Sequence, residues 1–178
     1  MSQKTVWNFD VAHSSVNFSV RHLMVSKVKG SFGSFRGQLQ LEGDSLIPSS
    51  VDVSIDTASI ETGVEDRDKH LRSADFFDVE KFPTMTFKSK RVEKPSSEGF
   101  QLVGDLSLHG VTKEVTLDVE IGGRQKDPWG SERVGYSATT RIDRKDFGLT
   151  WNQALEAGGI MVGDRVDITL EVEAVLAK

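Results

Sequence analysis

Apolar and polar residues alternate one by one along much of this chain, and no other feature constrains its fold as strongly. Val16, Phe18 and Val20 alternate with Asn17 and Ser19. Because successive side chains of a β-strand point to opposite faces, this pattern indicates a strand with one apolar and one polar face. The same alternation recurs in residues 51–56, 85–88, 105–108, 115–121 and 166–172. We therefore expect an all-β, antiparallel protein with half-buried strands.

Turn-forming residues separate the alternating stretches. Glycine, aspartate, serine or proline clusters occur at residues 42–44, 97–99, 122–123 and 127–130. Counting the stretches between such turns gives about eight strands. An even number of antiparallel strands with short connections can close into an up-and-down, lipocalin-like barrel, which leaves no exposed edge. A two-sheet sandwich is the alternative architecture.

Glycines also punctuate one of the expected strands. Residues 26–38 contain Gly30, Gly33 and Gly37 among bulky apolar side chains. Glycine inside a strand weakens it and often marks a bulge or a sharp bend. We expect this strand to bend where the barrel turns a corner.

One short stretch predicts a helix. Residues 65–72 carry acids in the first turn and bases in the last, as the helix dipole favours. The aromatic residues Phe76, Phe77 and Phe82 follow at once and are too apolar for a free loop. We expect this segment to fold across one barrel mouth as a lid-like loop.

Composition limits the partners and the compartment. The chain has 178 residues, which suits one domain over residues 1–178, and a net charge of −5 with acids and bases mixed. No basic stripe stands out, so a nucleic-acid partner is not expected. No stretch is long and apolar enough to predict a transmembrane segment, and residues 1–7 do not resemble a signal peptide. The cytoplasm is the expected location, or the periplasm if a signal peptide has been removed.

Residue patterns typical of catalysis or metal binding are missing from the sequence. It has no cysteine, and His13, His22, His70 and His109 do not have the spacing of paired metal ligands. His13 and His109 are expected instead to satisfy polar groups of turns. No nucleophile elbow of the GxSxG type is present. We therefore predict no catalytic residue, no metal and no cofactor.

The interior is the remaining candidate for function. Phenylalanine, methionine and tryptophan residues, among them Met24 and Trp129, concentrate near strand ends and mouth loops. They can either fill the barrel as an ordinary core or surround a cavity that holds an apolar ligand. The spacing of the residues alone favours the filled core.

Four sequence blocks carry a resemblance to a known family. They are residues 10–18, residues 67–78 together with 82–85, residues 104–112 and residues 144–148. In order and spacing these blocks resemble the YceI-like family of lipid- and polyisoprenoid-binding proteins over nearly the whole chain. The resemblance implies an extended eight-stranded barrel whose long pore holds an isoprenoid or another long-chain lipid. It also implies no catalysis, and an expected homodimer, since dimers are common in the family.

The resemblance and the alternation together give a set of candidate ligand-binding residues. The set comprises Phe18, Val20, His22, Phe32, Phe35, Arg67, His70, Phe76, Phe82, Met85, Phe87, Leu106, Leu108, Arg144 and Trp151. Arg67, His70 and Arg144 are expected near an anionic head group, if the ligand has one. The alternative for Arg67 is that it and Asp68 pair with neighbouring strands and hold the helix down.

Three functions are compatible with the sequence. The first is a carrier or store that transports, stores or shields a lipid such as an isoprenoid quinone precursor. The second is an enzyme that acts on an isoprenoid, and the third is a structural stress protein with a filled core. A carrier needs a cavity with an entrance, whereas an enzyme also needs titratable groups that converge in it.

Overall fold

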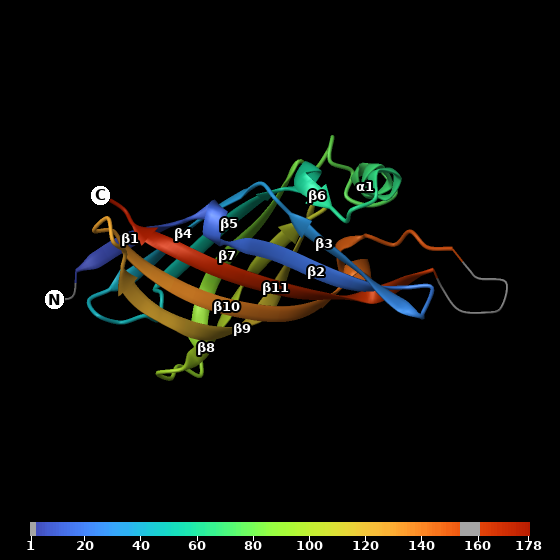
Figure 1. Cartoon of the computed structure of the whole chain (residues 1–178). Coiled ribbons are helices and arrows are strands. Elements are labelled where there is room, and N and C mark those ends of the chain that lie inside the picture. The colour runs from blue at the N-terminus through green and yellow to red at the C-terminus, as the bar shows by residue number, and fades with distance from the viewer. Residues whose placement is uncertain (1–2, 154–160) are drawn as a thin grey trace.

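A computed structural model describes residues 3–153 and 161–178 of the chain as one antiparallel sheet closed into an elongated barrel (Figure 1). Its strands are β1 (Lys4–Phe9), β2 (Ser15–His22), β3 (Ser26–Phe32), β4 (Phe35–Glu42), β5 (Ser50–Asp56), β6 (Ile60–Glu61), β7 (Thr84–Glu93), β8 (Gly99–Leu108), β9 (Val111–Lys126), β10 (Glu132–Asp143) and β11 (Val162–Leu176). Helix α1 spans Glu65–Arg72, and the short 3-10 helices η1, η2 and η3 span Val11–His13, Thr57–Ser59 and Arg144–Phe147.

These strand segments line up as eight full-length barrel strands, some made of two segments end to end, and we call each full-length strand a stave. β1 and β2 follow each other along the same edge of β11, which pairs with Trp7–Phe9 at one end and with Ser15–His22 at the other. β3 and β4 likewise form one stave beside them, and β5 with β6 forms the next. β7 to β11 each form a whole stave, and β11 closes the ring. The eight-stranded barrel predicted from the sequence is confirmed, and the sandwich is excluded.

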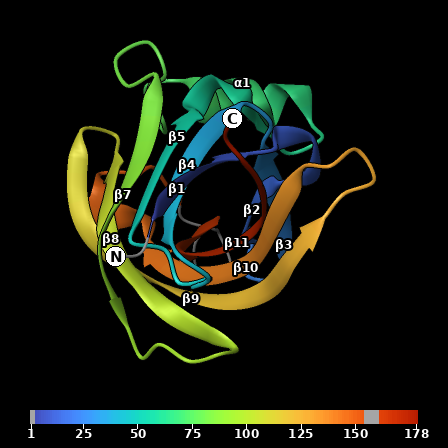
Figure 2. The ribbon, with the colours of Figure 1, turned by 90° about the vertical axis from the view of Figure 1, so that its left-hand side faces the viewer.

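The alternation places one face of each strand inside the barrel. On β10, for example, Val134, Tyr136 and Ala138 are buried, whereas Thr139 beside them is exposed. The view along the barrel shows the staves as a ring around the interior (Figure 2). The apolar residues of all staves therefore meet in one core.

Glycines shape the wall at two places. The strand expected over residues 26–38 is interrupted after Phe32, and a Cβ at Gly37 would lie 2.4 Å from the ring of Phe9. The turn predicted at residues 122–123 is wrong, because both glycines lie within β9. There Gly135 pairs with Gly123 and Tyr136 with Ile121, so that Gly122 forms a β-bulge.

The helix predicted over residues 65–72 is confirmed with the same bounds, and its acids and bases lie at the ends that the dipole favours. Leu71 and the following Phe76 and Phe77 turn toward the barrel interior, and the Phe77 ring packs edge-on against Phe32 with 5.7 Å between ring centroids. Helix and following segment thus cover part of the interior (Figure 1). In the described part of the chain, no helix combines the length and apolarity that crossing a membrane requires.

Two residues from the aromatic and methionine set are not in the interior. Met24 is 61% exposed in the turn between β2 and β3, and Trp129 is 85% exposed in the turn between β9 and β10. The expectation that they contribute to the interior is wrong, because both lie on tips that project beyond the paired strands.

Candidate ligand-binding cavity

The barrel encloses an apolar cavity of about 220 Å³. Every stave contributes to its lining, and the lining surface is almost wholly apolar. Phenylalanine rings from four staves, those of Phe18, Phe35, Phe87 and Phe100, surround the space. The barrel is therefore not a completely filled core.

Ten of the predicted binding residues line this cavity. They are Phe18, Val20, Phe32, Phe35, Phe76, Met85, Phe87, Leu106, Leu108 and Arg144. The inward face predicted from the alternation is confirmed for Phe18, Val20, Met85, Phe87, Leu106 and Leu108. Their contact with a ligand stays a prediction.

Five predicted residues lie outside the lining: His22, Arg67, His70, Phe82 and Trp151. His70 is 2.9 Å from Asp75, Nε2 to Oδ2, and its ring packs edge-on against Phe76 and Trp151. Phe82 packs on His109. His70 and Trp151 therefore lie against the lining residue Phe76, outside the lining itself.

Arg67 has a local structural role. Its Nη2 donates to the carbonyl of Thr62 at 2.7 Å and its Nε donates to the Thr62 hydroxyl at 2.6 Å. The buried carboxylate of Asp68 accepts hydrogen bonds from the backbone and the hydroxyl of the same threonine. Arg67 and Asp68 thus fix α1 to the residue after β6. The structural alternative for Arg67 expected contacts with neighbouring strands, and the partner is Thr62 just beyond a strand end instead.

Among the described lining residues Arg144 is the charged one, and its side chain is buried. Nε donates to Gly163 at 2.8 Å and Nη1 donates to Leu149 and Trp151 at 2.6 and 2.9 Å, all to backbone carbonyls. A longer bond of 3.3 Å runs from Nη2 to the carbonyl of Val162. Burial lowers the pKa of this guanidinium from its ordinary value. Its donors hold the segment before β11 against the barrel.

Tyr136 is a lining residue that the sequence reasoning missed. Its hydroxyl donates to the carbonyl of Leu46 at 2.6 Å, and burial raises its pKa above the ordinary value. The alternation could have found it, because Tyr136 shares the inward face of β10 with Val134 and Ala138.

Comparison with known families decides the relationship. The family model described as YceI-like domain matches residues 7–174. The chain belongs to the YceI-like family.

Individual relatives agree with this membership. A UPF0312 protein of Vibrio cholerae is 42% identical to this YceI-like chain over 164 residues, which are 92% of the chain and 82% of the relative. The crystal structure of the Campylobacter jejuni YCEI protein has a TM-score of 0.76 at 35% identity and covers 89% of this chain and 90% of its own. A polyisoprenoid binding domain from Saccharophagus degradans has the same fold, with a TM-score of 0.72 at 15% identity over 97% and 99% of the two chains.

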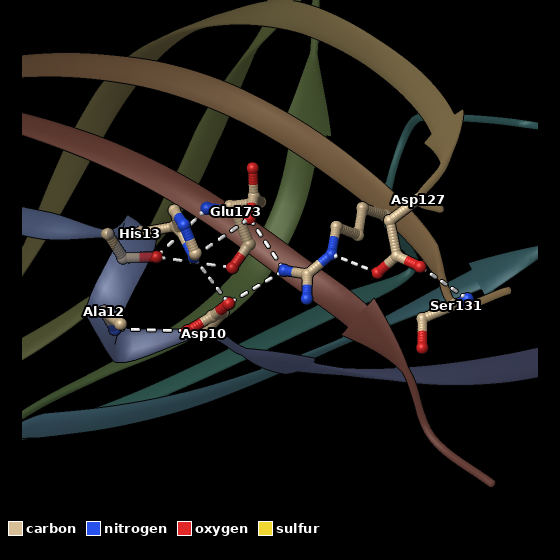
Figure 3. A network of polar contacts seen from close by, with 8 residues as sticks. Asp10, Ala12, His13, Asp127, Ser131 and Glu173 are labelled. Atoms are coloured by element: carbon tan, nitrogen blue, oxygen red, sulfur yellow. Dashed lines mark hydrogen bonds and ion pairs between the residues drawn. The ribbon is translucent and has the colours of Figure 1, made fainter. Parts of the chain in front are cut away.

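A polar network lies on the outside of this YceI-like barrel (Figure 3), and its ionisable side chains are not among the described residues that line the cavity. In the described residues it contains the one group of three side chains with metal-ligand geometry, Asp10, His13 and Glu173. However, Nη1 of Arg133 lies 2.7 Å from both carboxylates, and its Nε is 2.9 Å from Asp127. Hydrogen bonds from Arg133 and His13 hold the pKa of Asp10 below its usual value. The guanidinium supplies the positive charge that a metal ion would bring, so the group forms an ion-pair network.

The three histidines that remain are separated. His22 ends β2, His70 contacts Asp75, and Nδ1 of His109 is 3.1 Å from the carbonyl of Phe147. The role predicted for His109, to satisfy a backbone group, is confirmed. His13 differs, because its ring contacts carboxylates and not turn backbone.

Proposed function

We propose that this protein binds one long-chain lipid, an isoprenoid or a chemically similar chain, inside its barrel and leaves it chemically unchanged. The observation that carries the proposal is the apolar cavity, which all staves line. The family and the polyisoprenoid binding domain among the structural neighbours support it. Transport, storage or shielding of the lipid, a homodimer and a cytoplasmic location are further parts of the proposal.

Energetics favour a purely apolar ligand. Burying one methylene group contributes about 0.8 kcal/mol, so each five-carbon isoprene unit contributes on the order of 3 kcal/mol before the cost of ordering. A chain of several units therefore needs no polar contact for tight binding. The nearly apolar lining matches such a ligand better than it matches a sugar, a nucleotide or a peptide.

Catalysis would need titratable groups that converge on the ligand. In the described lining, the two ionisable side chains are Tyr136 and Arg144. Both are engaged with backbone carbonyls, at Leu46 and at the segment before β11. This arrangement supports a binding protein over an enzyme that acts on an isoprenoid.

The experiment is organic extraction of the purified protein, with mass spectrometry of the extract. Wild-type protein should release one lipid with a long hydrocarbon chain in stoichiometric amount. Ala138→Phe should lose most of it, because Ala138 is 6% exposed and lines the cavity, so a phenyl ring there occupies ligand space.

The matched control is Thr139→Phe, the same ring on the exposed face of the same strand. It should retain the lipid. Wild-type protein that yields no lipid and takes none up from a micellar isoprenoid alcohol would contradict the proposal and favour the structural protein. Conversion of the added lipid to a product would favour the enzyme.

A further inference from the structure

The turn between β2 and β3 presents three consecutive apolar side chains to solvent. Leu23, Met24 and Val25 are 37%, 61% and 79% exposed. The hairpin projects from the end of the barrel opposite to both chain ends (Figure 1). Exposed apolar residues are ordinary when scattered, but a contiguous group at a projecting tip indicates a contact surface. We refer to residues 23–25 as the apolar tip.

The backbone of this tip is unfavourable for the residues that occupy it. Leu23 and Met24 have φ angles of 52° and 62°, and the amide of Val25 donates to His22 at 3.2 Å. Two consecutive left-handed residues form the tight turn for which Asn-Gly is the preferred sequence. Leucine and methionine are disfavoured there, since their Cβ atoms crowd the backbone. Stability of the turn therefore does not explain these two side chains.

Basic residues surround the tip. The chain has no acid between Asp10 and Glu42, although its net charge is −5. On the two strands of the hairpin, Arg21 pairs directly with Lys27, and Lys29 pairs with Ser19. Like charges opposite each other in a sheet destabilise it unless an anion lies nearby.

The nearest acids of β11 do not neutralise these bases fully. Asp167 is 2.6 Å from Arg141 and Asp164 is 3.3 Å from Lys145, so each of these acids already pairs with another cation. Asp167 interacts with Lys27 as well, but less strongly than with Arg141. An apolar tip beside incompletely neutralised cations is the combination that binds the surface of an anionic membrane: the apolar side chains enter the acyl boundary and the cations contact head groups.

The tip also adjoins the cavity. Val20 lines the cavity and lies three residues before the tip. Val162 also lines the cavity and pairs with His22, the residue directly before the tip. A membrane that contacts the tip would therefore lie close to this end of the cavity.

We propose that the apolar tip inserts into the surface of an anionic lipid bilayer, with Arg21, Lys27 and Lys29 at the head groups. Docking brings the end of the cavity at Val20 and Val162 to the membrane, where a lipid enters or leaves. This inference rests on the proposed lipid binding, for which it names the donor or acceptor.

The test is co-sedimentation with vesicles of phosphatidylcholine that contain or lack phosphatidylglycerol. Wild-type protein should sediment with the anionic vesicles, and high salt should weaken the binding. The variant Leu23→Asn with Met24→Gly should bind at least about tenfold more weakly, because it removes two apolar anchors. It should melt at the same or a higher temperature, since Asn-Gly suits the turn, so that unfolding does not explain the loss.

Charge variants test the second half of the proposal. Arg21→Gln and Lys27→Gln should each weaken binding to anionic vesicles about fivefold and leave binding to neutral vesicles unchanged. The control is Trp129→Ser, which removes an exposed apolar residue from a turn in another part of the barrel. It should bind like the wild type.

Wild-type protein that does not sediment with anionic vesicles, or an Asn-Gly variant that binds as well as the wild type, would overturn the docking. The first of these results would point to a protein partner for the tip. Extraction of the purified protein separates the two hypotheses: lipid present without vesicle binding rejects only the docking, whereas failure to hold or take up any lipid rejects the proposed function.

Discussion

The guanidinium of Arg144 fixes the segment before β11 to the barrel, and the substitution Arg144→Met measures how much this contributes. Methionine keeps an unbranched apolar stem but donates no hydrogen bond. The carbonyls of Gly163, Leu149 and Trp151 then lose donors at 2.6 to 2.9 Å. Each unsatisfied buried acceptor costs about 1–3 kcal/mol.

Water reaching some of these carbonyls reduces the sum, so we expect the free energy of unfolding to fall by about 3–5 kcal/mol. For a chain of this size each kcal/mol lowers Tm by about 2–4 °C. The melting temperature should therefore fall by at least about 6 °C. Urea denaturation followed by circular dichroism gives the free energy, and lipid extraction of the folded fraction gives the occupancy.

Arg141→Met is the matched control on the outer face of β10. The Arg141 side chain is 59% exposed and pairs with Asp167, so its loss should cost less than about 1 kcal/mol. If Arg144→Met is as stable as this control but has lost its lipid, the reasoning is refuted. Arg144 would then act as a ligand for the head group and not as a structural clamp.

Two further predictions concern stability alone. Arg133 holds the pKa of Asp10 and Asp127 below their usual values, so both ionised carboxylates stabilise the fold above about pH 4. Their contribution to the free energy of unfolding is lost as pH falls further and the carboxylates become protonated. We expect the urea midpoint of unfolding to fall as pH is lowered from 6 to 2.5. Below about pH 4 the fall should be smaller for Arg133→Met than for the wild type. Gly104→Ala should lower Tm, because its Cβ would lie 2.4 Å from a backbone carbonyl of β7. A Cβ at Gly33 would have no neighbouring atom within 4 Å, so Gly33→Ala should leave Tm unchanged or raise it. Equal changes in Tm for the two variants would contradict the packing argument.

Local sequence patterns predicted the barrel well, because the alternation of apolar and polar residues shows which side chains of a strand face the interior. The inward face of Phe18 and Val20 and the helix over residues 65–72 follow from period and charge alone. The bulge at Gly122 was missed, since a glycine pair signals a turn and a bulge equally well in a sequence.

The polar contacts were less predictable, and the reason is distance along the chain. Arg67 contacts Thr62, five residues away, and a local search could have found this pair. Arg133 contacts Asp10, 123 residues away, and only the closure of the barrel brings them together. Arg144 contacts backbone carbonyls, which every residue has, so the sequence does not indicate which of them accept its hydrogen bonds.

The eight staves are not built alike, and this has a mechanical consequence. Five of them, β7 to β11, are single strands, whereas each of the other three is jointed by a 3-10 helix or by a break after Phe32. A ladder between two continuous strands resists deformation along most of its length, even where a bulge such as that at Gly122 interrupts it locally. A joint, by contrast, lets the two halves of a stave tilt separately. We expect the barrel to behave as a stiff half-shell facing a hinged one. Movement of the hinged side would then let the barrel interior adapt to ligands of different width, while the hydrogen bonds between the long strands stay intact.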